Sequence, residues 1–264
     1  MGRGRLGLAV NLIVAVRGKL WAEDMKAIIL SAGRGSRLLP LTETKPKCLL
    51  PVAGTSVLGF QLDTLERAGI EEVTVVTGFM TQRVEDEIAG RAGAMPVHVM
   101  FMPFYQVADN LASCLMVREA MNADFLLING DTLFEDALLE AVLASPKNDV
   151  QVTIDKKGDY DSDDMKVTLE GSRLMAIGKT LSAPETNGES IGMLRFMGAG
   201  RDRFKTKLNE MMRTGDGVNA WFLKAIDALA KSQGNVETFS IQGKNWAELD
   251  TMEDYDVLKA MFET

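Results

Sequence analysis

The chain has 264 residues, 46% hydrophobic and 25% charged, a balance typical of a globular protein with enough apolar residues for one large core or two small ones. Its formal net charge of −8 argues against a nucleic-acid partner, because binding to a phosphate backbone needs a basic surface. No apolar run in the sequence reaches the roughly 20 residues that a membrane span requires.

The scarcity of cysteine and histidine limits the chemistry further. Cys48 and Cys114 stand in apolar surroundings without metal-ligand spacing, which predicts buried thiols in a reducing, cytoplasmic setting. The single histidine, His98, alternates with valines on a predicted strand. A Ser-His-Asp hydrolase is therefore disfavoured.

Residues 1–24 differ in character from the rest of the chain. Two arginines precede an apolar stretch, as at the start of a secretory signal, but Asn11 interrupts it and no clean cleavage site follows. Met25 lies directly before the first predicted strand. We therefore predict an N-terminal extension, or a start at Met25, followed by one domain over residues 25–264. A short peripheral helix and an exported segment are the alternatives for residues 1–24.

The first predicted strand, 27–30, leads into Leu30-Ser-Ala-Gly-Arg-Gly-Ser-Arg37, and Lys45-Pro-Lys47 follows. Glycines let backbone N–H groups approach an anion closely, and the flanking cations neutralise it. The segment predicts a phosphate-binding loop at the end of the first strand of an α/β sheet. An ordinary strand-to-helix turn with solvent-facing charges is the alternative.

Strands and helices then alternate over about the first 145 residues, which predicts a parallel sheet with right-handed crossovers. The expected strands are 27–30, 73–77, 96–101 and 125–128, and the expected helices are 57–69, 81–89 and 109–121.

The second half of the chain shows a different pattern, because its first four predicted strands have no long helices between them. The expected strands are 150–154, 165–169, 174–177, 190–196 and 236–241, and the expected helices are 201–213, 219–232 and 253–262. The predicted fold is α/β, with a Rossmann-like mixed sheet that is mostly parallel in front, has an antiparallel extension, and is flanked by helices.

Two aspartates follow apolar segments. Asp131 comes after strand 125–128 and Gly130, and Asp250 comes after Trp246-Ala-Glu-Leu249. Ligands of open parallel sheets bind outside the carboxyl ends of the strands, and Mg²⁺ takes carboxylates together with substrate phosphates. We therefore predict Asp131 and Asp250 as Mg²⁺ ligands. The alternative is that each aspartate caps a helix.

The glycine pattern separates several phosphate-binding families. The Rossmann fingerprint needs a third glycine and the Walker loop needs Gly-Lys-Ser/Thr, and neither is present. Instead, Leu-Ser-Ala-Gly-x-Gly-Ser-Arg with Pro-Lys ending ten residues after Arg37 resembles the signature of nucleotidyltransferases that join a nucleoside triphosphate to a sugar phosphate or similar phosphomonoester. This resemblance covers about residues 25–262 and implies a GT-A-like fold and an enzyme. Further matching motifs are Gly130-Asp-Thr, Ile177-Gly-Lys179, Glu189-Ser-Ile-Gly-Met193 and Trp246-x-x-x-Asp250.

The resemblance implies a role for each matching residue. Arg37 would contact the outer phosphates, Lys47 the reacting α-phosphate, and Lys179 the phosphate of the acceptor. Asp131 and Asp250 would hold Mg²⁺. The nucleotide-binding residues would be Leu30, Ala32, Gly33, Gly35, Ser36, Gly78, Asn110 and Ser113.

The segment Asp109-Asn-Leu-Ala-Ser113 departs from enzymes with glucose-type acceptors, which usually show Gly-Thr-Ala there. It resembles the Asn-x-x-Ser-Leu segment of bacterial phosphocholine cytidylyltransferases and of relatives that act on aminoalkylphosphonates. This implies CTP, with Asn110 and Ser113 on the base or ribose and Gly78 letting the base lie against the backbone. Asn110 as a plain helix cap is the alternative, and both roles are compatible.

Such an acceptor carries a cation, which carboxylates and aromatic faces attract. We predict an acceptor site that includes Asp164, from the acidic stretch 158–164, together with Glu189, Trp221 and Trp246. A solvated hairpin loop and core tryptophans are the alternative.

The leading hypothesis is a Mg²⁺-dependent cytidylyltransferase whose partners are a nucleoside triphosphate, CTP favoured, and a small phosphorylated acceptor. A sugar-1-phosphate nucleotidyltransferase that uses UTP, dTTP or GTP is the alternative enzyme. A non-catalytic nucleotide sensor is the alternative of another class, but it predicts degraded metal and basic positions, whereas Arg37, Lys47, Asp131 and Asp250 are intact. The sequence predicts no oligomeric state.

Overall fold

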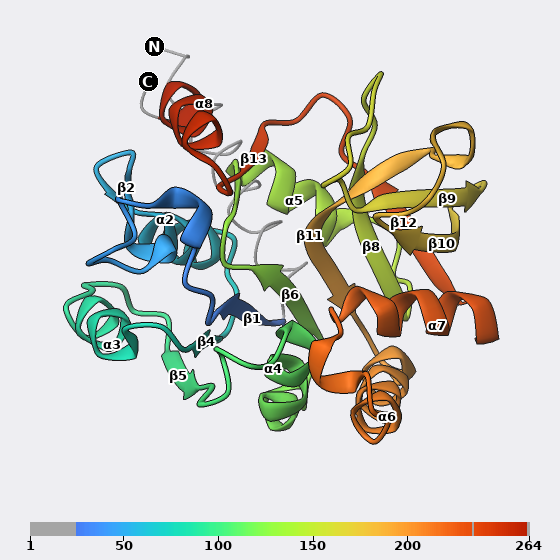
Figure 1. Cartoon of the computed structure of the whole chain (residues 1–264), viewed down its shortest axis with the longest axis horizontal. Helices are drawn as coiled ribbons and strands as arrows, with labels where there is room; N and C mark the ends of the chain where they lie inside the picture. Colours follow the sequence, from blue (N-terminus) through green and yellow to red (C-terminus); the bar gives the residue numbers. More distant parts are fainter. Residues whose placement is uncertain (1–24, 234, 263–264) are drawn as a thin grey trace, which may run out of the picture.

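The computed structural model describes residues 25–233 and 235–262, so the predictions for residues 1–24 lie outside it. Its main feature is a nine-stranded mixed sheet in the order β5-β4-β1-β6-β11-β8-β12-β10-β9 (Figure 1). No helix of the described residues is long and apolar enough to cross a membrane.

The first half of this sheet is parallel, as predicted. It contains β5 (Val97–Phe101), β4 (Val73–Thr77), β1 (Lys26–Ser31) and β6 (Phe125–Asn129). Their carboxyl ends meet at one edge of the sheet, where the predicted phosphate loop begins.

The second half is antiparallel except for one pair, β8 with β12, which is parallel. Here β11 (Gly188–Phe196) pairs antiparallel with β6 and with β8. The other strands are β8 (Val150–Asp155), β12 (Val236–Ser240), β10 (Arg173–Gly178) and β9 (Lys166–Glu170). The predicted α/β mixed sheet is therefore confirmed.

Helices cover both faces of the sheet because successive strand side chains point to opposite sides. In β1, Ile28 faces one core cluster, while Ala27 and Ile29 face another. The first cluster includes α4 (Asn110–Met116), α6 (Ala199–Met212) and α7 (Leu223–Gln233), and the second includes α2 (Val57–Arg67), α3 (Thr81–Ala89) and α5 (Asp136–Ala144).

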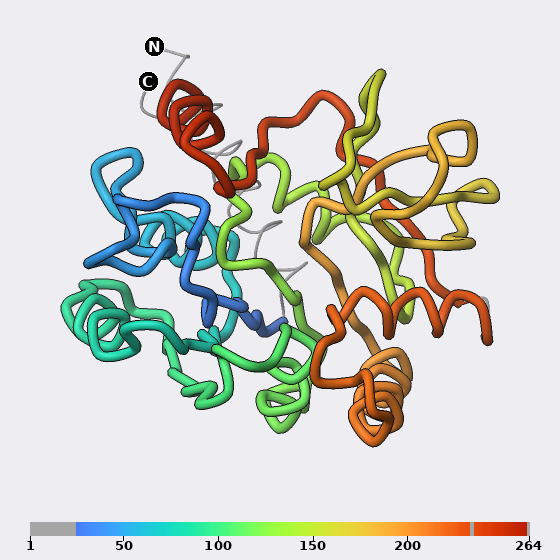
Figure 2. The backbone as a smooth tube through the Cα atoms, in the orientation of Figure 1, coloured from blue at the N-terminus to red at the C-terminus, as the bar shows by residue number. Residues whose placement is uncertain are grey.

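A small two-stranded sheet beside the main sheet brings the C-terminal segment close to residues 51–56 near the N-terminal end of the described chain. The short strands β7 (Thr132–Phe134) and β13 (Trp246–Glu248) pair antiparallel, and α8 (Met252–Phe262) follows. Figure 2 shows α8 beside the hairpin of β2 (Pro51–Val52) and β3 (Thr55–Ser56), where the Tyr255 hydroxyl donates to the Pro51 carbonyl at 2.7 Å.

Two helices differ from their predicted ranges by four residues or more, and a third helix was not predicted. The predicted helix 109–121 ends as α4 at Met116, because the chain leaves α-geometry at Val117 and forms a 3₁₀ turn, a common ending of helices. Helix α7 begins four residues later than predicted, at Leu223. Helix α5 is missing from the prediction because its nearly continuous apolar run hides the helical period.

Candidate active site

The loop after β1 depends on a glycine that no other residue replaces easily. Gly35 has φ 70°, in the left-handed region, and its carbonyl accepts a hydrogen bond from Thr42 Oγ1 at 2.8 Å. A Cβ atom at this position would lie 2.8 Å from the Cβ of Lys47. Gly35 thus lets the predicted phosphate loop close against Lys47.

Lys47 is the hub of the site. Its Nζ donates to Asp131 Oδ2 at 2.6 Å and to Asp250 Oδ1 at 2.8 Å. Burial disfavours the charged form of this lysine, but the two carboxylates outweigh it and hold its pKa above the ordinary value. Lys47 therefore stays an ammonium group at neutral pH.

Strand pairing brings the two aspartates together from positions far apart in the sequence. Asp131 precedes β7 and Asp250 follows β13, and the Leu249 N–H donates to the Asp131 carbonyl at 3.0 Å. Neither aspartate caps a helix: Asp131 leads into β7, and α8 is capped by Thr251, whose Oγ1 accepts from the Asp254 N–H at 3.2 Å. The helix-cap alternative is therefore wrong.

The electrostatics of this pair favour a cation. Arg37 Nη2 lies 3.0 Å from Asp250 Oδ2. Burial alone would raise the pKa of Asp250, but Lys47 and Arg37 hold it below its ordinary value, so the carboxylate is ionised. In Asp131, Oδ1 is buried and has no hydrogen-bond partner among the described residues. That orphaned oxygen could serve as a ligand for a metal.

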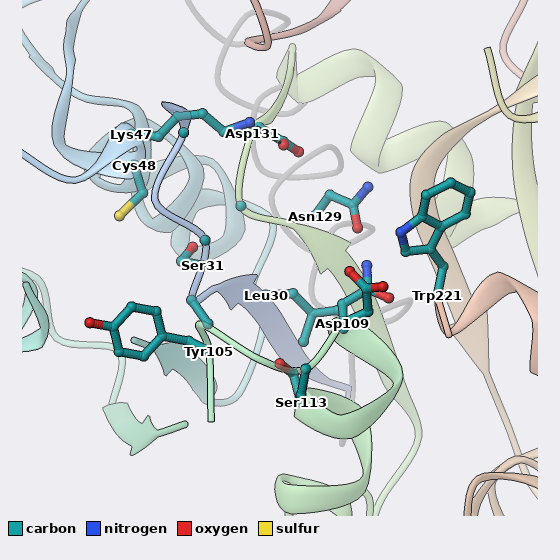
Figure 3. Close-up of a pocket in the computed structure, with 16 residues that line it drawn as sticks. Leu30, Ser31, Lys47, Cys48, Tyr105, Asp109, Ser113, Asn129, Asp131 and Trp221 are labelled. Carbon is teal, nitrogen blue, oxygen red and sulfur yellow. Dashed lines mark hydrogen bonds and ion pairs between the residues drawn. The ribbon is translucent and has the colours of Figure 1, made fainter. Parts of the chain in front are cut away.

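A pocket of about 280 Å³ opens at the carboxyl ends of β1 and β6 (Figure 3). Lys47 and Asp131 meet at one end of it, and Trp221 faces it from the segment before α7. Nine of the predicted site residues line it: Leu30, Ala32, Gly33, Gly35, Lys47, Asn110, Ser113, Asp131 and Trp221.

An adjoining cleft of about 540 Å³ adds Ser36, Arg37, Asp250 and Lys179. Lys179 follows β10, and its carbonyl accepts from the Nζ of the buried Lys166 at 3.0 Å. Its own Nζ lies 4.9 Å from the centre of the Trp221 ring. The predicted donor-side and acceptor-side lysines, Lys47 and Lys179, thus line one continuous cleft.

The structure narrows the roles of two predicted nucleotide-binding residues. Asn110 does not cap α4, so the helix-cap alternative is wrong; its Oδ1 accepts from the Phe222 N–H at 2.8 Å, which leaves its amide N–H₂ for other contacts. Gly78 is buried, and a Cβ there would lie 2.6 Å from the Ala32 carbonyl oxygen and 2.7 Å from Tyr105. Gly78 therefore makes room for Tyr105, and Tyr105 lines the pocket in its place.

The predicted acceptor residues divide between two places. Glu189 and Asp164 share a hollow of about 380 Å³ with Trp246, whose Nε1 donates to Asp155 Oδ2 at 2.8 Å. Trp221 instead lines the pocket beside Asn110. The four residues predicted to form one acceptor site are therefore not all together.

The carboxylates of Glu189 and Asp164 already have a cation. Lys157 Nζ lies 3.0 Å from Glu189 and 2.9 Å from Asp164. Burial and the nearby Asp164 nevertheless raise the pKa of Glu189 to about 7, against the pull of Lys157.

Comparison with known proteins agrees with this geometry. A family model described as nucleotidyl transferase matches residues 26–163. The chain belongs to this family. The predicted family and enzyme class are thereby confirmed.

Two curated relatives and one solved structure illustrate the likeness. The CMP-5'-(3-aminopropyl)phosphonate synthase of Streptomyces rubellomurinus is 36% identical over 126 residues, 48% of this chain and 20% of that protein. The CTP:phosphoglutamine cytidylyltransferase of Campylobacter jejuni is 24% identical over 266 residues, 88% of this chain and 98% of that protein. The chain thus spans about a fifth of the first relative. The CTP:phosphocholine cytidylyltransferase of Streptococcus pneumoniae shares the fold with a TM-score of 0.76 at 20% identity, covering 90% of this chain and 98% of that one.

Several residues of this nucleotidyltransferase cleft were not predicted. Tyr105 and Asn129 line the pocket, and the sequence signal for Asn129 was its place at the carboxyl end of a predicted parallel strand. Gly192 has φ 71°, and a Cβ there would lie 2.5 Å from the Asn129 amide nitrogen. Asp163 lies in the acidic stretch 158–164 but was not singled out, because its partners Arg37 and Lys179 lie on other segments. Lys157 had no comparable signal, because its partner Glu189 lies on a distant strand.

Proposed function

We propose that the chain is a Mg²⁺-dependent cytidylyltransferase that transfers CMP from CTP to a small phosphomonoester such as phosphocholine, or to an aminoalkylphosphonate, and releases pyrophosphate. The observation that carries the proposal is the Lys47 ammonium held between Asp131 and Asp250, within the cleft that also contains Arg37 and Lys179. Cations and carboxylates arranged in this way suit a reaction between two polyanions.

The proposed reaction needs positioning more than proton transfer. An oxygen of the acceptor phosphate attacks the α-phosphorus of CTP, a new P–O bond forms, and the bond to the β-phosphate oxygen breaks so that pyrophosphate leaves with the electron pair. The attacking oxygen is already anionic, so no strong general base is required. This agrees with the position of His98, which lies on β5 with its side chain 60% exposed.

Each cation of the cleft would have its own role in this reaction. Lys47 would stabilise the charge that develops on the α-phosphoryl group, and Arg37 would neutralise the departing pyrophosphate. Lys179 would hold the acceptor phosphate in line, which removes much of the entropic cost of bringing two anions together. Each of these side chains now contacts an aspartate, and a phosphate would replace that partner.

Magnesium would be held by Asp131 and Asp250. The buried Oδ1 of Asp131, which has no hydrogen-bond partner in the described part of the chain, and the ionised carboxylate of Asp250 fit a hard cation with oxygen ligands. Among the described residues no group of three or more His, Cys, Asp and Glu side chains forms a metal site, so substrate phosphates and water would complete the shell. When bound, Mg²⁺ would supply charge neutralisation of the triphosphate.

The preference for CTP is supported by the Asn110 segment and by relatives named as cytidylyltransferases. With its Oδ1 bound to the Phe222 N–H, Asn110 presents N–H donors, which fit the acceptor groups of a cytosine or ribose. Glu189 and Asp164 would attract the ammonium group of a phosphocholine or aminoalkyl acceptor.

Pyrophosphate release with each of CTP, UTP, dTTP and GTP, combined with phosphocholine, phosphoethanolamine, 2-aminoethylphosphonate and glucose 1-phosphate, tests the proposal. We expect turnover with CTP and the ammonium-bearing acceptors, and its loss when EDTA removes divalent cations. Turnover confined to glucose 1-phosphate would instead support the sugar-phosphate alternative. No pyrophosphate from any combination would contradict the proposal.

A further inference from the structure

The loop between β8 and β9, residues 156–165, places two side chains of opposite charge in the cleft. At one end, Lys157 Nζ lies 2.9 Å from the carboxylate of Asp164 and 3.0 Å from that of Glu189. These carboxylates are 11% and 7% exposed, whereas Lys157 is 39% exposed. A cation from the surface thus neutralises an almost buried acidic pair.

At the other end, Asp163 contacts the two cations assigned to phosphate. Its Oδ2 lies 3.2 Å from Arg37 Nη1, and its Oδ1 lies 3.3 Å from Lys179 Nζ. Asp163 is 69% exposed, so these ion pairs contribute little to the stability of the protein. It nevertheless occupies positions that a phosphate group would need.

The loop fixes its backbone around Asp163 and Asp164 by its own hydrogen bonds. Asp161 Oδ1 accepts from the N–H groups of Asp163 at 2.7 Å and Asp164 at 3.0 Å. Asp164 Oδ2 in turn accepts from the Asp161 N–H at 2.7 Å. Lys157 and Asp163 line the same hollow, of about 380 Å³, and both belong to this one short loop.

A phosphoalkylamine carries the same pair of charges, an anionic phosphate and an ammonium group on a short chain. We propose that the β8–β9 loop is an internal mimic of such a zwitterionic acceptor, with Asp163 in place of its phosphate and Lys157 in place of its ammonium group. The inference rests on the proposed function and identifies its acceptor class. Lys157 and Asp163 are thus specificity residues that compete with the acceptor for its binding groups.

Lys157 competes with the ammonium group of the acceptor and Asp163 competes with its phosphate. Removing one charge at a time therefore tests the inference. Replacing Lys157 by Gln frees Asp164 and Glu189 for an ammonium group but changes nothing for a phosphate. Replacing Asp163 by Asn frees Arg37 and Lys179 for any phosphate.

The experiment compares phosphoethanolamine with ethyl phosphate, which is the same molecule without the ammonium group. KM for phosphoethanolamine and the inhibition constant of ethyl phosphate are measured at saturating CTP. For Lys157→Gln we expect KM to fall about three- to tenfold with the inhibition constant unchanged. For Asp163→Asn we expect both to fall about two- to fivefold, the scale of an exposed ion pair. Lys156→Gln and Asp159→Asn, exposed neighbours on the same loop, are the matched controls and should change neither value.

Calorimetric titration of the CTP-free protein with phosphoethanolamine provides the same comparison without catalysis. Absence of turnover in the wild type would count against the proposed function. An unchanged or weakened affinity for phosphoethanolamine in Lys157→Gln would overturn the inference, because it would make Lys157 structural or a phosphate ligand. Lys157→Arg, which keeps the competing cation, should retain the wild-type affinity, and thermal unfolding of Lys157→Gln shows whether loss of folding explains its result.

Discussion

The two sides of the cleft that we propose for the donor and the acceptor neutralise their charges in different ways. On the donor side, Lys47, Asp131 and Asp250 come from three distant segments and meet because strand ends and strand pairing bring them together. On the acceptor side, Lys157 and Asp163 come from one loop and reach across to partners on other elements. The sheet fixes the first arrangement, whereas the second depends on a loop whose charged side chains we propose a ligand displaces. Mutations should therefore stop catalysis on the donor side and retune affinity on the acceptor side.

Lys47→Met is the most severe test of this difference. It removes the cation assigned to the α-phosphoryl group, and loss of one preorganised donor of this kind costs about 10²- to 10³-fold in kcat. We expect a decrease near the upper end of that range, because Lys47 also neutralises Asp131 and Asp250. Steady-state pyrophosphate release measures it, and Lys45→Met, two residues earlier, is the control. If only the affinity for the acceptor decreased, Lys47 would act on the acceptor and not on the α-phosphoryl group, which would contradict its assignment.

Asp131→Asn tests the same side with a smaller change. The amide keeps the shape of the side chain but removes the negative charge and one oxygen ligand, so we expect kcat to fall about 10²-fold and the Mg²⁺ concentration for half-maximal rate to rise. Thermal unfolding should shift little, because Lys47 keeps its contact with Asp250. A large loss of thermal stability with normal Mg²⁺ dependence would make Asp131 a structural residue.

The difference between local motifs and contacts made by distant segments also explains which parts of the fold and the site could be predicted from the sequence. Strand 73–77 was predicted with the observed bounds, because a buried run between turns has a clear local signal. Lys47 and the two aspartates could be singled out because each lies within a short motif, and the structure brings them into contact. The pairing of Lys157 with Glu189 was not found, since it joins segments that only the antiparallel sheet brings together. Trp221 was assigned to the acceptor by residue type, and its position beside Asn110 depends on where α7 begins.

Glu189 gives a pH test of the acceptor side. Its folded pKa of about 7 lies above its ordinary value of 4.5, so the folded protein binds a proton more readily than the unfolded chain between those pH values. The free energy of unfolding should therefore decrease as the pH rises from about 4.5 to about 7. In Glu189→Gln, which resembles the protonated acid, this dependence should disappear.

The comparison of the two proteins isolates the effect from other titrating groups. At pH 5 the stabilities should be similar, and at pH 8 the variant should be the more stable, by on the order of 2 kcal/mol. Urea unfolding at the two pH values measures the difference. A constant difference at both values would mean that Glu189 is ionised throughout and that Lys157 dominates its environment.

The two tryptophans give the smallest and most discriminating test. Trp246→Phe keeps an aromatic face in the acceptor-side hollow but removes the N–H that donates to Asp155, and we expect KM for the acceptor to rise about two- to fivefold with KM for CTP unchanged. Trp221→Phe should raise KM for CTP as well, because Trp221 lines the pocket that contains Asn110 and Ser113, while its ring also lies 4.9 Å from Lys179 Nζ. Both constants come from the same steady-state assay, so each variant is the control for the other. If both variants changed only the acceptor constant, the donor pocket would have to lie elsewhere in the cleft, and the division between its two sides would fail.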